Sequence, residues 1–245
     1  MDEILYPRSY LSAKPISYRS TPKKEKDRDP YDGLRRWSAL THGLGILLAM
    51  SGTVLLLLRA SRLGSSLWHY VTFAVYGAAM IELYAASTLY HSVTTTVRGR
   101  IILKKLDHAS IYFLIAGTYT PICLIPLRGP WGWSLFGIIW GLALLGVGLT
   151  LIWIHSPRWV TSGIYLFMGW LAIIAIYPLA QVLALRGLFW LLLGGVLYTI
   201  GGLMYALKWP GRSNPKFGCH EIFHVFVLLG SVCHFLLMYR VVAHL

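Results

Sequence analysis

The chain has 245 residues, of which 56% are hydrophobic and only 13% are charged, and its mean hydropathy is +0.61. Soluble domains carry about 25% charged residues, so this composition excludes an ordinary soluble protein and predicts an all-α, polytopic membrane protein. The formal net charge is +13. Because no folded basic domain accompanies this charge, we expect no nucleic-acid partner and instead expect the basic residues to contact membrane lipids.

The first segment, residues 1–34, is predicted to be a disordered basic tail. Of the 31 charged residues of the chain, 15 lie in the first 36 positions, including the mixed run PKKEKDRDP at 22–30. Such runs are typical of solvated, unfolded segments. No apolar stretch with a cleavage site opens the chain, so this segment is not expected to be a secretory signal. We therefore divide the chain into a cytoplasmic tail, 1–34, and one transmembrane domain, 35–245.

Seven stretches of the second segment are long and apolar enough to cross a membrane, which takes about 20 residues. They run over 37–58, 67–91, 101–125, 131–154, 159–182, 187–207 and 219–240. Links that contain Pro and Gly, such as KWPGRSNPKFG at 208–218, separate them. We expect a seven-helix bundle in which glycines such as Gly137 and Gly141 allow close helix packing.

The orientation of the bundle follows from the distribution of Lys and Arg. With seven spans, 17 of the 22 basic residues lie on the side of the N-terminus. The other side holds the remaining five, Arg59, Arg62, Arg128, Arg186 and Arg240. The positive-inside rule then places the N-terminus in the cytoplasm and the C-terminus outside. In a bacterium, this membrane would be the plasma membrane.

Acidic residues are rare beyond the tail. Six of the nine lie at or before Asp32, and the other three are Glu82, Asp107 and Glu221. A charge inside a membrane is costly, so each of the three is a candidate functional residue. Glu82 is nine residues before His91, about 180° around the helix, which excludes direct contact and leaves it at most a supporting role.

Three histidines come to the same depth as Asp107 on this topology. His91 ends the second span, Asp107 lies near the start of the third, and His220 and His224 lie in the first turns of the seventh. Residues four apart share one helix face at a separation of about 6 Å, so His220 and His224 can bind one metal. Three imidazoles with one open position are the ligand set of a catalytic zinc that activates water. Asp107 would hold that water or orient a ligand.

The remaining intramembrane histidines have a simpler expected role. Single histidines in spans usually form hydrogen bonds between helices, and this is what we expect of His42, His108, His155 and His234. His234 lies 14 residues after His220, within about 40° of the same helix face, which hints at a polar interior beyond the metal.

Three motifs in this order resemble the hemolysin III family, microbial relatives of the progestin and adipoQ receptors in a superfamily that includes the alkaline ceramidases. They are STLYH at 87–91, LDHASIYFLIAGTYTP at 106–121 and HEIFH at 220–224, and the resemblance covers residues 35–245. It implies that His91, His220 and His224 bind zinc, that Asp107 contacts the zinc-bound water and that Ser87 supports the site. The alternative for Ser87 is a hydrogen bond to its own helix backbone.

Glu221 lies between the two histidines of HEIFH but is not part of the family signature. We expect it to support the site or to face the lipid headgroups. In an intramembrane metalloprotease, it would instead be the general base. Such an enzyme would normally add an acidic ligand on a later helix, and no acid follows Glu221.

Two functional hypotheses from different classes remain. The first is a zinc-dependent membrane hydrolase that cleaves a lipid-like amide, with the acyl chain between the helices and the reaction near the cytoplasmic face. The second is a pore-forming or channel-like hemolysin, or a membrane sensor with structural zinc. A cavity that reaches the metal would favour the first hypothesis. A polar path across the whole membrane would favour the second.

Overall fold

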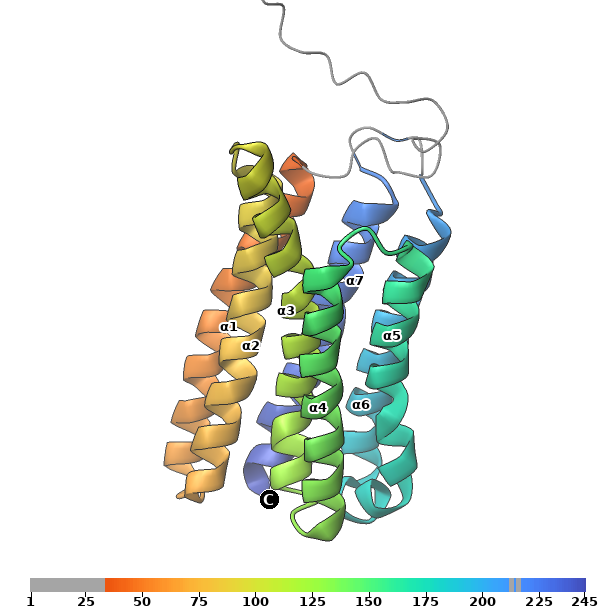
Figure 1. The fold of residues 1–245 in the computed structure, drawn as a ribbon. Coiled ribbons are helices and arrows are strands. Elements are labelled where there is room, and N and C mark those ends of the chain that lie inside the picture. Colours follow the sequence, from red (N-terminus) through yellow and green to blue (C-terminus); the bar gives the residue numbers. More distant parts are fainter. Residues whose placement is uncertain (1–33, 212–213, 215–216) are drawn as a thin grey trace, which may run out of the picture. The chain divides into compact units, whose positions relative to one another are not determined.

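The computed structural model describes residues 34–211, 214 and 217–245. Apart from Leu34, the predicted tail lies outside these residues. Within them, every regular element is a helix and there is no strand, which confirms the all-α class (Figure 1). The helices are α1 (Arg36–Arg62), α2 (Leu67–Ser92), α3 (Val97–Leu124), α4 (Pro130–Ile152), α5 (Arg158–Trp170), α6 (Ile176–Leu207) and α7 (Cys219–Arg240), with short 3-10 helices at Leu171–Ala175 and Val242–His244.

Five helical segments of the described chain are long and apolar enough to cross a membrane. They are Arg36–Arg62, Leu67–Ser92, Pro130–Ile152, Arg158–Leu207 and Cys219–His244. Their outer faces expose large apolar side chains such as Leu47, Leu145 and Leu185, as expected of surfaces that contact lipid. Helix α3 is as long as the others, but its first half carries four basic residues and Asp107. The chain is therefore a multi-pass, all-α membrane protein.

The fifth and sixth predicted spans form one helical run, Arg158–Leu207, that folds back on itself. Ala184, with φ 53° and ψ 177°, interrupts the helical geometry. The Trp170 indole N–H donates to Thr199 Oγ1 at 2.9 Å, and Leu166 packs beside Gly202. Residues before and after Ala184 therefore lie antiparallel. The break falls where the sequence predicted it, but a single residue takes the place of the predicted loop.

Glycines allow close approach of the first three helices, but not at the two positions singled out from the sequence. A Cβ added to Gly45 would lie 2.5 Å from the Tyr84 ring, and one added to Gly117 would lie 2.5 Å from the Ala79 Cβ. An added Cβ at Gly137 or Gly141 meets no atom within 4 Å. These two glycines face outward on α4, so the packing role predicted for them within the chain is wrong.

The bundle brings together one end of each of the helices that carry the predicted site. Figure 1 shows the starts of α1, α3 and α7 and the end of α2 at one end of the bundle, with the C-terminus at the other. His91 lies in the last turn of α2, and His220 lies in the first turn of α7. Residues that are 129 positions apart in sequence thereby become neighbours.

Candidate metal centre

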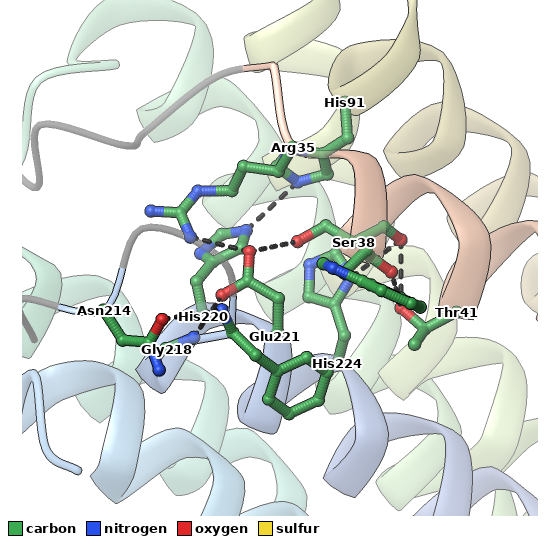
Figure 2. A network of polar contacts seen from close by, with 11 residues as sticks. Arg35, Ser38, Thr41, His91, Asn214, Gly218, His220, Glu221 and His224 are labelled. Carbon is green, nitrogen blue, oxygen red and sulfur yellow. Dashed lines mark hydrogen bonds and ion pairs between the residues drawn. The ribbon is translucent and has the colours of Figure 1, made fainter. Parts of the chain in front are cut away.

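Three buried histidines form a compact cluster between α2 and α7 (Figure 2). One ring nitrogen from each of His91, His220 and His224 lies within 4.8 Å of the others. The Nε2 atoms of His91 and His220 are 3.1 Å apart. The exposed fractions of the three side chains are 1%, 5% and 2%, respectively. The structure therefore brings together the three histidines that the sequence singled out.

The geometry of the cluster fits one metal ion. Zinc–nitrogen bonds of about 2.0–2.1 Å in a tetrahedron separate two ligand nitrogens by about 3.3 Å, close to the 3.1 Å between the Nε2 atoms of His91 and His220. The ring of His224 has its Nδ1 atom 3.3 Å from the Ser38 carbonyl oxygen. Because a carbonyl only accepts, Nδ1–H donates and Nε2 is left as the ligand atom. Three such nitrogens can hold a metal ion and leave one coordination position open.

Glu221 is buried and paired at the start of α7. Its Oε1 atom accepts from Arg35 Nη1 at 2.8 Å and from Ser38 Oγ at 3.2 Å, and its Oε2 atom accepts from the Gly218 backbone N–H at 2.8 Å. The backbone N–H of Arg35 donates to the His91 carbonyl at 3.0 Å. Glu221 therefore does not face the lipid headgroups. With both oxygens bonded and its charge balanced, it is also poorly placed to act as a general base.

Ser38 connects this ion pair to the cluster. Its hydroxyl donates to Glu221, and its carbonyl accepts from His224, so one residue of α1 contacts both Glu221 and His224 on α7 (Figure 2). A displacement of the carboxylate would therefore move the backbone group that orients the His224 ring. This coupling could not be read from the sequence because the partners are more than 180 residues apart.

His42 belongs to the site, although the sequence analysis gave it only an interhelical hydrogen bond. Its ring stacks on His224 with centroids 3.6 Å apart and an interplanar angle of 12°, and it meets the edge of Tyr84. Neither ring nitrogen forms a hydrogen bond to another described residue, so that expectation is wrong. His42 shares a helix face with Ser38, four residues earlier, but nothing in the sequence signalled a role for either residue.

Of the other predicted site residues, Asp107 and Ser87 are buried and Glu82 is exposed. Asp107 is buried and lines the same cavity as His220 and His224. Ser87, one turn before His91, is buried, and its hydroxyl has no hydrogen-bond partner among the described residues, so the alternative bond to its own helix is not made. Glu82 is exposed on the outer face of α2. The structure does not bring Glu82 to the histidines, which corrects the supporting role expected of it.

A cavity of about 140 Å³ extends from the cluster into the bundle. At one end it is lined by His220, His224 and Asp107, and it reaches as far as His234. Between these ends, its walls include Leu83, Ile111, Leu114, Ile115 and Val227. The end of the cavity that is lined by the clustered histidines thus opens into a largely apolar space between the helices.

Comparison with known proteins gives matches over most of the bundle. A family model described as haemolysin-III related matches residues 36–235. The chain is 42% identical over 198 residues to the Hemolysin-3 homolog of Bacillus subtilis (strain 168), covering 81% of this chain and 89% of that protein. It is 41% identical over 199 residues to Hemolysin-3 of Bacillus cereus, covering 81% and 87%. It is 26% identical over 184 residues to the ADIPOR-like receptor IZH2 of Saccharomyces cerevisiae, covering 68% and 57%.

The ion pair predicts a stability difference between two acidic positions. Glu221→Gln removes the charge that pairs with the buried Arg35 guanidinium, and removing one partner of a buried pair costs about 3–5 kcal/mol. Thermal unfolding in detergent should therefore occur at a clearly lower temperature than for the wild type. The matched control, Glu82→Gln on the exposed face of α2, should unfold like the wild type. Equal unfolding temperatures for both variants would contradict the structural role of the pair.

Proposed function

Because the chain belongs to the hemolysin III family, within the progestin and adipoQ receptor superfamily, we propose that it is a zinc-dependent membrane hydrolase that cleaves a lipid-like amide. His91, His220 and His224 would be the zinc ligands, and Asp107 the catalytic carboxylate. The reaction would take place near the cytoplasmic ends of the helices.

The observation that carries this proposal is the continuity between the histidine cluster and the apolar cavity. The same cavity is lined by two of the three clustered histidines, by Asp107 and by a series of aliphatic side chains. A substrate with a polar, cleavable group and a long hydrocarbon chain matches this distribution. An ion-conducting pore would need a continuous polar path across the membrane, whereas the walls of this cavity, although they include hydroxyl side chains such as Thr118 and Ser162, are apolar over most of their area.

Asp107, Ser87 and His42 would have different roles in this reaction. A bound zinc would supply Lewis acidity and a water that is nucleophilic at neutral pH. Asp107 would orient that water, accept its proton during attack on the amide carbonyl and deliver the proton to the departing amine. The hydroxyl of Ser87, which has no partner among the described residues, would hydrogen-bond to the water or to the carbonyl oxygen. His42, stacked on His224, would restrict rotation of that ring.

We also propose that the chain crosses the membrane seven times, with its N-terminus in the cytoplasm. The antiparallel arms on either side of Ala184 and the length of α3, 28 residues, support seven crossings rather than five. The asymmetry of Lys and Arg supports the orientation. Both statements place the metal centre at the cytoplasmic side.

This topology predicts the accessibility of a C-terminal tag. In right-side-out vesicles, protease added from outside should remove the tag without permeabilising the membrane, because an odd number of crossings puts the two termini on opposite sides. A tag protected in intact vesicles and cleaved only after detergent is added would mean that the C-terminus is cytoplasmic. The number or the direction of the crossings would then be wrong.

The metal site predicts the zinc content of purified protein. Wild-type protein should hold about one zinc per chain, and His220→Ala or His224→Ala should lose most of it, because two ligands remain where a stable zinc site needs three protein ligands. His69→Ala is the control, since His69 is also buried on α2 but lies at the start of that helix, far from the cluster. Elemental analysis of the four proteins measures this. Full zinc occupancy in both His220 and His224 variants would rule out the three-histidine site.

The assignment of Asp107 predicts a separation of metal binding from turnover. Asp107→Asn keeps the size of the side chain but removes its basicity, so zinc should remain bound while amide hydrolysis falls by about 10²–10⁴-fold, as is typical of a lost general base. Hydrolysis of a long-chain fatty amide by purified protein measures the rate, normalised to folded protein.

Glu221→Gln provides the comparison for this experiment. Its folded fraction should keep most of the activity, because the amide oxygen of glutamine can still accept a hydrogen bond from Ser38 or Gly218 and because the carboxylate is not assigned to the reaction. Loss of turnover in Glu221→Gln together with normal turnover in Asp107→Asn would reverse the assignment of the base.

A further inference from the structure

His234 is a buried histidine whose two ring nitrogens form no hydrogen bond to the described residues. It lies on α7, and its side chain is 8% exposed. The Leu191 carbonyl lies near the ring, yet neither ring nitrogen forms a hydrogen bond of normal geometry to a described residue. An unpaired buried polar group costs about 1–3 kcal/mol, so a histidine at this depth needs a partner that the described residues do not supply.

The residues around His234 pack against its ring but do not hydrogen-bond to its nitrogen atoms. A Cβ at Gly194 would collide with the His234 ring, so α6 has a glycine where the ring needs space. The edge of Tyr198 meets the ring at 5.4 Å and 78°. The Tyr198 hydroxyl is already engaged with Ser231 Oγ at 2.9 Å, and the same Ser231 oxygen accepts from Tyr84 at 2.7 Å. The neighbouring polar groups are therefore partnered with one another.

His234 also lines the cavity that contains the metal-binding end. It lies in the wall of that cavity and of a second cavity that continues between α3, α5 and α6. Along α7, His234 is 10 residues beyond His224 and 14 beyond His220, which is about 15–21 Å at 1.5 Å per residue. The intervening wall is apolar over most of its area, with Leu114 and Val227 among its residues, and it also includes hydroxyl side chains such as Thr118.

From this arrangement we propose that His234 hydrogen-bonds to an oxygen atom on the ligand's hydrocarbon chain. The inferred ligands are acyl compounds with a hydroxyl about 12–17 carbons from the carbonyl. An extended chain advances about 1.25 Å per carbon, given a bond of about 1.52 Å and an angle of about 111°, and that number of carbons spans the distance from the histidine cluster to His234. A neutral imidazole has one donor and one acceptor nitrogen, so it can bind a hydroxyl in either direction.

The inference rests on the proposed function only for the class of ligand, an acyl chain whose carbonyl end lies at the metal-binding histidines. The requirement that His234 find a hydrogen-bond partner comes from its burial and its place in the cavity wall. A water molecule held by His234 is the competing occupant. In that case, the protein would not distinguish plain from hydroxylated chains.

The test is the binding of three fatty acids to the purified full-length protein with its native metal content. They are unsubstituted octadecanoic acid and its analogues with a hydroxyl at carbon 6 or at carbon 14. Acids are used because they contain no amide and are not turned over. The carbon-14 hydroxyl should bind about 2- to 12-fold tighter than the plain chain, the range that corresponds to one net hydrogen bond. The carbon-6 hydroxyl should show no such gain, because it lies about 10 Å short of the carbon-14 position that reaches His234.

Variants assign the preference to His234. His234→Phe keeps a ring but removes both nitrogens, so the carbon-14 preference should disappear, whereas His234→Gln should retain part of it. Thr118→Val is the matched control, because Thr118 lines both cavities but its hydroxyl already donates to the Leu114 carbonyl at 2.8 Å. This variant should keep the full preference.

Two results overturn the inference. One is equal affinity of the wild type for all three acids, which needs no variant and so stands even if His234→Phe fails to fold. The other is an undiminished carbon-14 preference in His234→Phe. A wild-type protein that hydrolyses fatty amides but shows no carbon-14 preference would refute the His234 site alone. A preserved preference in a protein that hydrolyses no amide would refute the enzymatic proposal alone.

Discussion

The buried ion pair between Arg35 and Glu221 is the interaction on which the candidate site depends. A buried charge is strongly unfavourable unless it is paired, and these two side chains supply opposite charges to each other. Arg35 also donates from its backbone to the last turn of α2, and Glu221 also accepts from Gly218 at the start of α7. One pair of charges thus fixes the relative positions of three helix ends. The three clustered histidines lie on two of those ends.

This arrangement explains how the end of the bundle holds the three histidines in one cluster. His91 is held through its carbonyl by Arg35, and His224 is oriented through the Ser38 carbonyl and covered by the His42 ring. The cluster is therefore supported from α1, which contributes none of the three clustered nitrogens. Behind it, the cavity runs between α3, α5, α6 and α7. The helix ends position the clustered histidines, and the interior of the bundle contains the cavity.

The histidine cluster could be predicted because its determinants are local or follow from topology. The four-residue spacing of His220 and His224 sets a common face, and helix direction sets the depth of His91. Two other contacts could not be predicted from the sequence: the pairing of Arg35 with Glu221 and the stacking of His42 on His224. Both depend on the rotation of α1 relative to α7. Glu82 shows the same limit, since the helical period excluded contact with His91 but did not reveal that the side chain faces outward. The fold-back at Ala184 was placed correctly between two apolar stretches, although the nearest glycine, Gly187, lies three residues after it.

X-ray absorption at the zinc edge of the purified protein tests the central claim most directly, because it reports the elements and distances around the metal without any assumption about activity. The account predicts about one zinc per chain with three imidazole nitrogens at about 2.0–2.1 Å and one oxygen in the fourth position. His91→Ala should remove one imidazole contribution or the metal itself. Bound zinc with sulfur scattering, or a spectrum unchanged by His91→Ala, would contradict the account.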